Sequence, residues 1–72
     1  MARRIEDFPI EELETDRRAS LADITLCDLA LIAGTETYFG GKSSTQYRLE
    51  QNKRIVRVID AELERRSKEA GA

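Results

Sequence analysis

Residues 21–33 read LADITLCDLALIA, the only stretch of the chain in which apolar residues surround a helical wheel. Asp23, Thr25 and Asp28 are its polar interruptions. A helix that is apolar on all sides needs burial on more than one side. The stretch therefore predicts either the central helix of an ordinary core or a helix whose spare face is covered by a second chain.

The length of the chain favours the second possibility. Its 72 residues allow one small domain, residues 1–72, and such a fold buries only about 60% of the surface that the unfolded chain exposes. Stability must then come from a disulfide, a metal or a partner. Cys27 is the only cysteine and histidine is absent, which excludes an intrachain disulfide and a Cys/His zinc site. We expect no metal, no cofactor, and association of two chains.

Charge is nearly balanced overall and uneven along the chain. Fourteen acidic and 12 basic residues give a net charge of −2, so no overall field attracts nucleic acid or anionic lipid. Residues 21–41 contain three acids and no base, whereas residues 42–57 contain five bases and one acid. The first residues are charged, and no apolar run approaches the roughly 18 residues of a membrane span. We expect a soluble, cytoplasmic protein without membrane association.

Local signals divide the chain into helices and connections. Pro9 suits the first turn of a helix, and Ser20 with Asp23 resembles a capping box at the start of another. Gly40 and Gly41 form the clearest break, although Gly34 is an alternative helix end. The predicted segments are a flexible N-terminus (1–8), a short helix (9–18), a central helix (21–39), a Gly/Ser connection (40–44) and a long amphipathic helix (45–68).

Both long helices carry an apolar stripe with alternating spacings of three and four residues. The stripe of the second helix comprises Leu49, Asn52, Val56, Ile59 and Leu63. Two such helices joined by a short connection predict an all-α fold, an antiparallel helical hairpin with a short N-terminal helix. We expect it to dimerise into a helical bundle. The predicted dimer interface is the stripe of the central helix, Ile24, Cys27, Leu31 and Gly34.

The sequence lacks the parts of a catalytic site. Its acids lie on faces that the pattern assigns to solvent, where their pKa values are not raised for acid–base work. Gly41-Lys42-Ser43 resembles the end of a phosphate-binding loop, but position 36, where the first glycine belongs, is Glu. We expect the protein not to be an enzyme.

The main functional expectation is binding to another protein, as in a small regulator, an inhibitor or a phage-type accessory protein. Aromatic residues and arginine commonly anchor protein interfaces. Such residues flank the Gly-rich connection, and the candidate contacts are Tyr38, Phe39, Lys42, Tyr47 and Arg48. The alternative is that the aromatic residues close the open end of the hairpin's own core.

A second expectation comes from residues 24–34, ITLCDLALIAG, which resemble the first half of a repressor-type helix-turn-helix. The resemblance implies a DNA-binding transcriptional regulator. Its base-contacting residues would be Gln46, Arg48, Gln51 and Asn52, and its phosphate-contacting residues Lys53, Arg54 and Arg57. Gly40 and Ser43 stand where a recognition helix carries apolar residues, so DNA binding is the alternative to protein binding.

Overall fold

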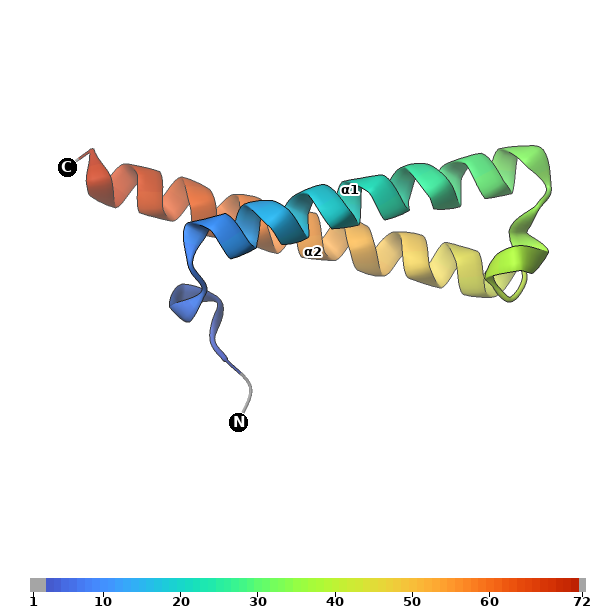
Figure 1. The fold of residues 1–72 in the computed structure, drawn as a ribbon, viewed down its shortest axis with the longest axis horizontal. Coiled ribbons are helices and arrows are strands. Elements are labelled where there is room, and N and C mark those ends of the chain that lie inside the picture. The colour runs from blue at the N-terminus through green and yellow to red at the C-terminus, as the bar shows by residue number, and fades with distance from the viewer. Residues whose placement is uncertain (1–2, 72) are drawn as a thin grey trace.

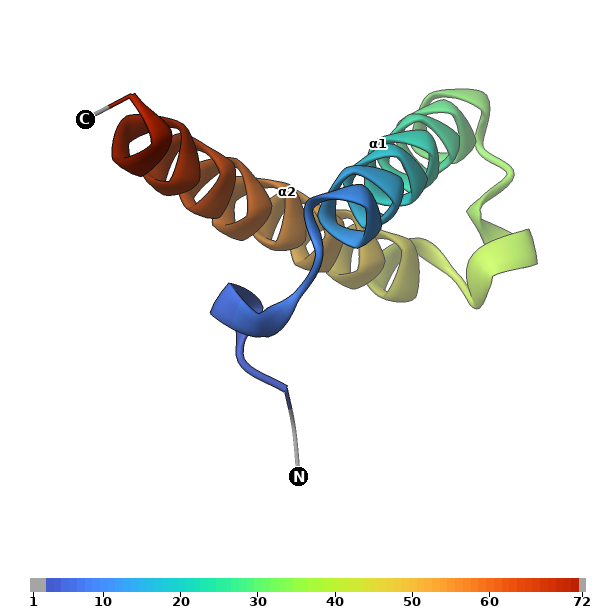
Figure 2. The ribbon, with the colours of Figure 1, turned by 60° about the vertical axis from the view of Figure 1, so that its left-hand side comes forward.

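The computed structural model describes residues 3–71, which form two long helices and two short 3₁₀ helices (Figure 1). Their order is η1 (Ile5–Asp7), α1 (Ile10–Ala33), η2 (Glu36–Phe39) and α2 (Lys42–Ala70). Helices α1 and α2 pack antiparallel, and η2 lies at the connection between them. The C-terminal end of α2 projects beyond the start of α1 (Figures 1 and 2). The all-α helical hairpin predicted from the sequence is confirmed.

The contact between the helices follows the predicted stripe on α2. Leu49 and Ile59 are buried, and Asn52, Val56 and Leu63 are half-buried. The buried positions of α1 are Leu13, Ser20, Cys27 and Ala30. The first three are seven residues apart, so they fall on one helix face. Three of these four side chains are small, which lets the two helix backbones approach closely.

The predicted break between a short helix and a central helix is wrong, because α1 continues from Ile10 through Ser20 to Ala33. Neither Gly nor Pro occurs between Ile10 and Ala33, and a continuous helix buries Leu13 and Cys27 on the same face. This burial outweighs the low helix propensity of a single serine. Ser20 is therefore a buried interior residue, and Asp23 does not act in a capping box.

The predicted ends of the connection also require correction. Helix α1 stops at Ala33 and not at Phe39, because Gly34 adopts a left-handed conformation (φ 73°, ψ 25°) and its N–H bonds to the carbonyl of Ala30. Helix α2 begins at Lys42 instead of Thr45 and continues past the predicted end at 68. The buried Thr45 hydroxyl donates to the carbonyl of Gly41 at 2.8 Å, which fixes this first turn.

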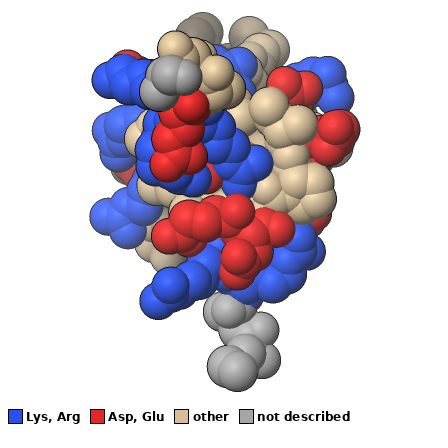
Figure 3. Space-filling model, turned by 90° about the vertical axis from the view of Figure 1, so that its left-hand side faces the viewer, with Lys and Arg blue, Asp and Glu red and all other residues tan. Residues whose placement is uncertain are grey.

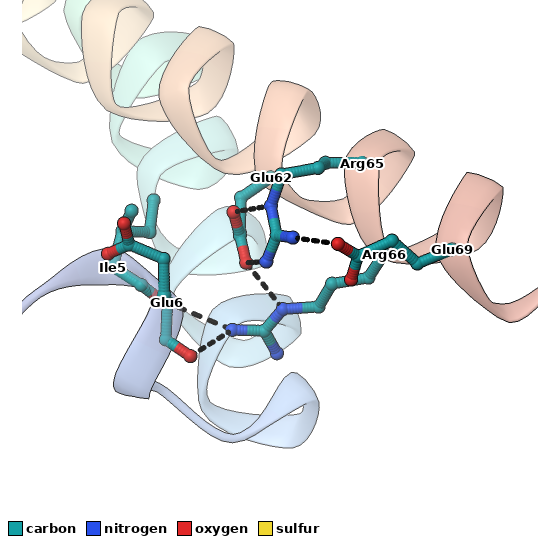
Figure 4. A network of polar contacts seen from close by, with 6 residues as sticks. All are labelled: Ile5, Glu6, Glu62, Arg65, Arg66 and Glu69. Carbon is teal, nitrogen blue, oxygen red and sulfur yellow. Dashed lines mark hydrogen bonds and ion pairs between the residues drawn. The ribbon is translucent and has the colours of Figure 1, made fainter.

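The N-terminal segment is held against α2, whereas we predicted a flexible segment over residues 1–8. Arg66 Nη2 donates to the carbonyl oxygens of Ile5 and Glu6, each at 3.2 Å (Figure 4). Arg66 Nε also donates to Glu62 at 2.6 Å. The bonds join η1 to the C-terminal half of α2. Met1 and Ala2, which belong to the same prediction, lie outside the described residues.

A buried carboxylate lies at the centre of this network. The side chain of Glu62 is 5% exposed and accepts hydrogen bonds from Arg65 Nε and Nη2 at 2.9 and 2.8 Å. Arg65 also pairs with Glu69 at 2.8 Å. Acidic and basic side chains intermingle over much of the end of the molecule that carries the C-terminal end of α2 (Figure 3). Glu62 is thus held by two arginines from the next turn of α2.

The hydrogen bonds from Arg65 and Arg66 lower the pKa of Glu62 from 4.5 to about 2. A lowered pKa in the folded state stabilises the fold above the ordinary pKa, and this stabilisation is lost as pH falls from 4.5 toward 2. We expect the Glu62→Gln variant to lose less stability than the wild type over this interval in urea unfolding. Glu64→Gln, at an exposed position facing Lys68, is the control and should retain the wild-type pH dependence. Equal pH profiles for Glu62→Gln and wild type would contradict this account of Glu62.

Candidate interaction surface

The outer face of the second half of α1 is apolar and exposed. Its large side chains, which we call the α1 strip, are Leu21 (37% exposed), Leu26 (52%), Leu29 (57%) and Ile32 (82%). At 100° per residue these positions lie on the side of the helix opposite Cys27, which is fully buried. The described chain places no second long helix against this side of α1 (Figure 2). The helical segment 21–33 is thus buried on one side only.

Charge is nearly absent from this half of the helix. Between Arg18 and Glu36 the only charged residues are Asp23 and Asp28. Asp23 points to α2, and Asp28 is exposed at the edge of the strip. A contiguous apolar surface with a sparsely charged border is typical of a binding surface, whereas single exposed apolar residues are not.

Asp23 joins the two helices through a polar network. Its carboxylate accepts from Arg48 Nε at 2.6 Å, from Arg48 Nη2 at 2.5 Å and from Asn52 Nδ2 at 2.5 Å. The hydrogen bond from Arg48 is the main reason that the pKa of Asp23 is lowered. The side chain of Asp23 is only 17% exposed, so the network fixes the register of α1 against α2. Asn52, the polar residue of the predicted α2 stripe, takes part in this network.

The predicted partner contacts divide into two groups. Tyr38 and Tyr47 are 87% and 69% exposed, and Lys42 is exposed as well. Phe39 is half-buried, and the guanidinium carbon of Arg48 lies 5.2 Å from the centre of its ring, a cation–π contact. Phe39 and Arg48 therefore help to close the connected end of the hairpin, and the other three residues face solvent.

The predicted dimer interface lies mainly on the face that packs against α2. Cys27 is fully buried, Ile24 and Leu31 are half-buried, and Gly34 is exposed. Burial raises the pKa of the Cys27 thiol. Cys27 has no surface left for a second chain, so this part of the predicted interface requires correction. The heptad spacing identified an apolar face correctly, but α2 of the same chain covers it.

The residues expected to contact DNA are likewise divided. Gln46, Lys53, Arg54 and Arg57 are exposed and Gln51 is half-buried, whereas Arg48 and Asn52 bind Asp23. Lys53 also lies 3.7 Å from Glu50. The helix that contains residues 24–33 runs antiparallel to α2, whereas the two helices of a helix-turn-helix cross steeply. The exposed basic residues Lys53, Arg54 and Arg57 lie within about 100° of one another around α2, and we call them the basic ridge.

A second apolar feature, which the sequence reasoning missed, is a groove between η1, the start of α1 and the middle of α2. Its volume is about 320 Å³, and its apolar lining consists of Ile5, Phe8, Leu13, Ile55, Val58 and Ile59. The signal that could have found it is the widening of the α2 stripe at Ile55 and Val58, which remain 44% and 48% exposed. The segment that forms its other wall, η1, has too little apolar pattern to be placed from sequence.

The described residues contain no group of three or more His, Cys, Asp and Glu side chains that could hold a metal. Over residues 3–71, neither long helix has a window apolar enough for a membrane crossing. Comparison of the chain with known protein families, curated proteins and solved structures gave no significant match.

Proposed function

We propose that this protein is a non-catalytic helical module that acts by binding another protein chain through the α1 strip. The observation that carries the proposal is the exposure of Leu26, Leu29 and Ile32 on one apolar helix face. The acids with lowered pKa values, Asp23 and Glu62, are held by arginines. This arrangement suits a structural role better than proton transfer.

The size of the strip indicates what the partner must supply. Full burial of a leucine or isoleucine is worth about 1.5–3 kcal/mol, so covering the exposed parts of these four side chains contributes about 3–7 kcal/mol. Association costs about 4–15 kcal/mol in lost freedom of motion. The strip alone barely offsets this cost. A partner with an apolar face of its own is therefore required.

The proposal is tested by photo-crosslinking from the strip. One variant carries p-benzoylphenylalanine in place of Ile32, and the matched control carries it in place of Gln46, an exposed position on α2. Both are irradiated in a lysate of the source organism, and the products are identified by mass spectrometry. We expect protein adducts, with this chain or another, from position 32 and few from position 46. Adducts from position 46 alone, or from neither position, would refute the proposal.

The basic ridge supports DNA binding as the second candidate function. Under the main proposal we expect no retardation of duplex DNA at about 0.15 M salt, because the chain carries a net charge of −2. Under the alternative, a gel shift appears at low salt, weakens steeply as salt rises, and is lost in a Lys53→Glu/Arg54→Glu variant that remains folded. A gel shift with these properties would favour the alternative.

A further inference from the structure

We propose that the partner on the α1 strip is a second copy of this chain, docked antiparallel along α1 about a two-fold axis near Leu26. The inference rests on the proposed function and adds the identity and orientation of the partner. The result is a row of four helices in which the two α1 helices are adjacent in the middle and each α2 lies on an outer side.

The strip is complementary to itself when the two copies run in opposite directions. Leu21 and Ile32 lie on the same edge of the strip, and Leu26 lies on the other edge, near the midpoint between them. The distance from Leu21 to Ile32 is about 16 Å along the helix axis. An antiparallel pair places Leu21 of one copy opposite Ile32 of the other and brings the two Leu26 side chains together. Three of the four large side chains of the strip then meet a large side chain, and Leu29 faces the smaller residues Ala22 and Thr25.

Small residues between the large ones allow close approach. Ala22, Thr25 and Ala33 lie on the same outer face and are exposed. The hydroxyl of Thr25 donates to the carbonyl of Leu21 at 3.2 Å, so its hydrogen is already engaged. Contact of a second α1 helix with these small residues therefore buries little unsatisfied polar surface.

Charge distinguishes the antiparallel from the parallel arrangement. The last turn of α1 contains no basic residue, so the negative end of its helix dipole is not compensated there. Arg18 is exposed, lies one turn before Leu21 in line with the strip, and makes no hydrogen bond or ion pair within residues 3–71. The antiparallel pair brings Arg18 beside Gly34 and Thr35 of the second copy, at this negative end. A parallel pair would place Arg18 against Arg18 of the second copy and would align the two helix dipoles in the same direction.

The identity of the partner as a second copy is tested by sedimentation equilibrium of the purified full chain at micromolar concentrations. We expect the wild type to be a dimer and Leu29→Glu to raise the dissociation constant by about 100-fold or more, since each dimer would bury two unpaired carboxylates. Leu29 is exposed in the single chain, so the variant should keep its helical circular dichroism. Tyr47→Glu, an equally drastic change at an exposed position of α2, is the control and should leave the dimer intact. A wild type that remains monomeric would overturn the inference.

The orientation is tested with single cysteines introduced at the strip, while the buried Cys27 is left in place. We expect Leu21→Cys mixed with Ile32→Cys to form a mixed disulfide on mild oxidation, and Leu26→Cys to form a disulfide with itself. Predominant like-with-like disulfides from the Leu21→Cys and Ile32→Cys chains would refute the antiparallel arrangement. A monomeric wild type that crosslinks another protein from position 32 refutes the second copy and leaves the proposed function standing. A monomeric wild type that gives no protein adduct from position 32 refutes both the second copy and the proposed function.

Discussion

Replacing Ile59 by alanine is expected to lower the free energy of unfolding by about 2–5 kcal/mol. Ile59 is 4% exposed and belongs to a core of five buried apolar residues in the described chain, the others being Leu13, Cys27, Ala30 and Leu49. A core in a domain below about 70–80 residues rarely supplies more than about 3–5 kcal/mol. The loss of one large side chain therefore removes most of the stability, and the variant should be largely unfolded at room temperature.

Urea unfolding followed by circular dichroism measures this effect at a fixed protein concentration. Ile55→Ala is the matched control because it removes the same atoms one turn earlier on α2. Ile55 is 44% exposed. The cost of Ile55→Ala should be well below that of Ile59→Ala, since an exposed site leaves no enclosed cavity. Equal losses for the two variants would show that Ile59 is not part of the core.

The long helix shows which part of the fold the sequence predicts well. Leu49, Val56 and Ile59 repeat at helical spacing, and no Gly or Pro interrupts residues 42–70. Pattern and propensity agree over this length, so the existence of α2 and its inward face were predicted correctly. Its ends were less predictable because they depend on single hydrogen bonds. The bond from the Thr45 hydroxyl to Gly41 is an example.

Helix α1 shows where local signals mislead. Ser20 and Asp23 have the spacing of a capping box, but the chain gains more by burying Leu13 and Cys27 on one continuous face. Ser20 is buried as a result, and Asp23 bonds to Arg48, 25 residues away in sequence. A capping box links residues that are three positions apart, so it carries no information about a contact between residues that are 25 positions apart. The competition is decided by packing between helices, which a single sequence does not display.

The sequence indicated an uncovered apolar face within residues 21–33 but did not identify which residues form it. The excess of apolar residues in 21–33 correctly indicated that one helix would leave part of itself uncovered. The heptad spacing then drew attention to Ile24, Cys27 and Leu31, although the large exposed residues are Leu26, Leu29 and Ile32. Both faces of the segment are apolar, so the sequence alone does not tell which of them α2 covers.

The connection between the helices provides a test of backbone conformation without side-chain packing. Gly41 has φ 107° and ψ 174°, a region that is essentially restricted to glycine. A Cβ atom built on Gly41 would meet nothing within 4 Å. The N–H of Gly41 donates to the carbonyl of Glu36 at 2.9 Å, and its carbonyl accepts from the N–H of Thr45 at 3.0 Å. These bonds link η2 to the first turn of α2 and hold the residue in this conformation.

Gly41→Ala is therefore expected to destabilise the protein by about 1–3 kcal/mol through backbone strain alone. The melting temperature of a domain of this size falls by about 4–8 °C per kcal/mol, which makes the effect easy to measure by thermal unfolding. Gly34→Asn is the control, because Gly34 lies in the left-handed helical region, which asparagine tolerates better than other residues with a side chain. We expect Gly34→Asn to cost clearly less. If Gly41→Ala melts at the wild-type temperature, the chain can start α2 without this conformation, and the connection is not what fixes the first turn of the helix.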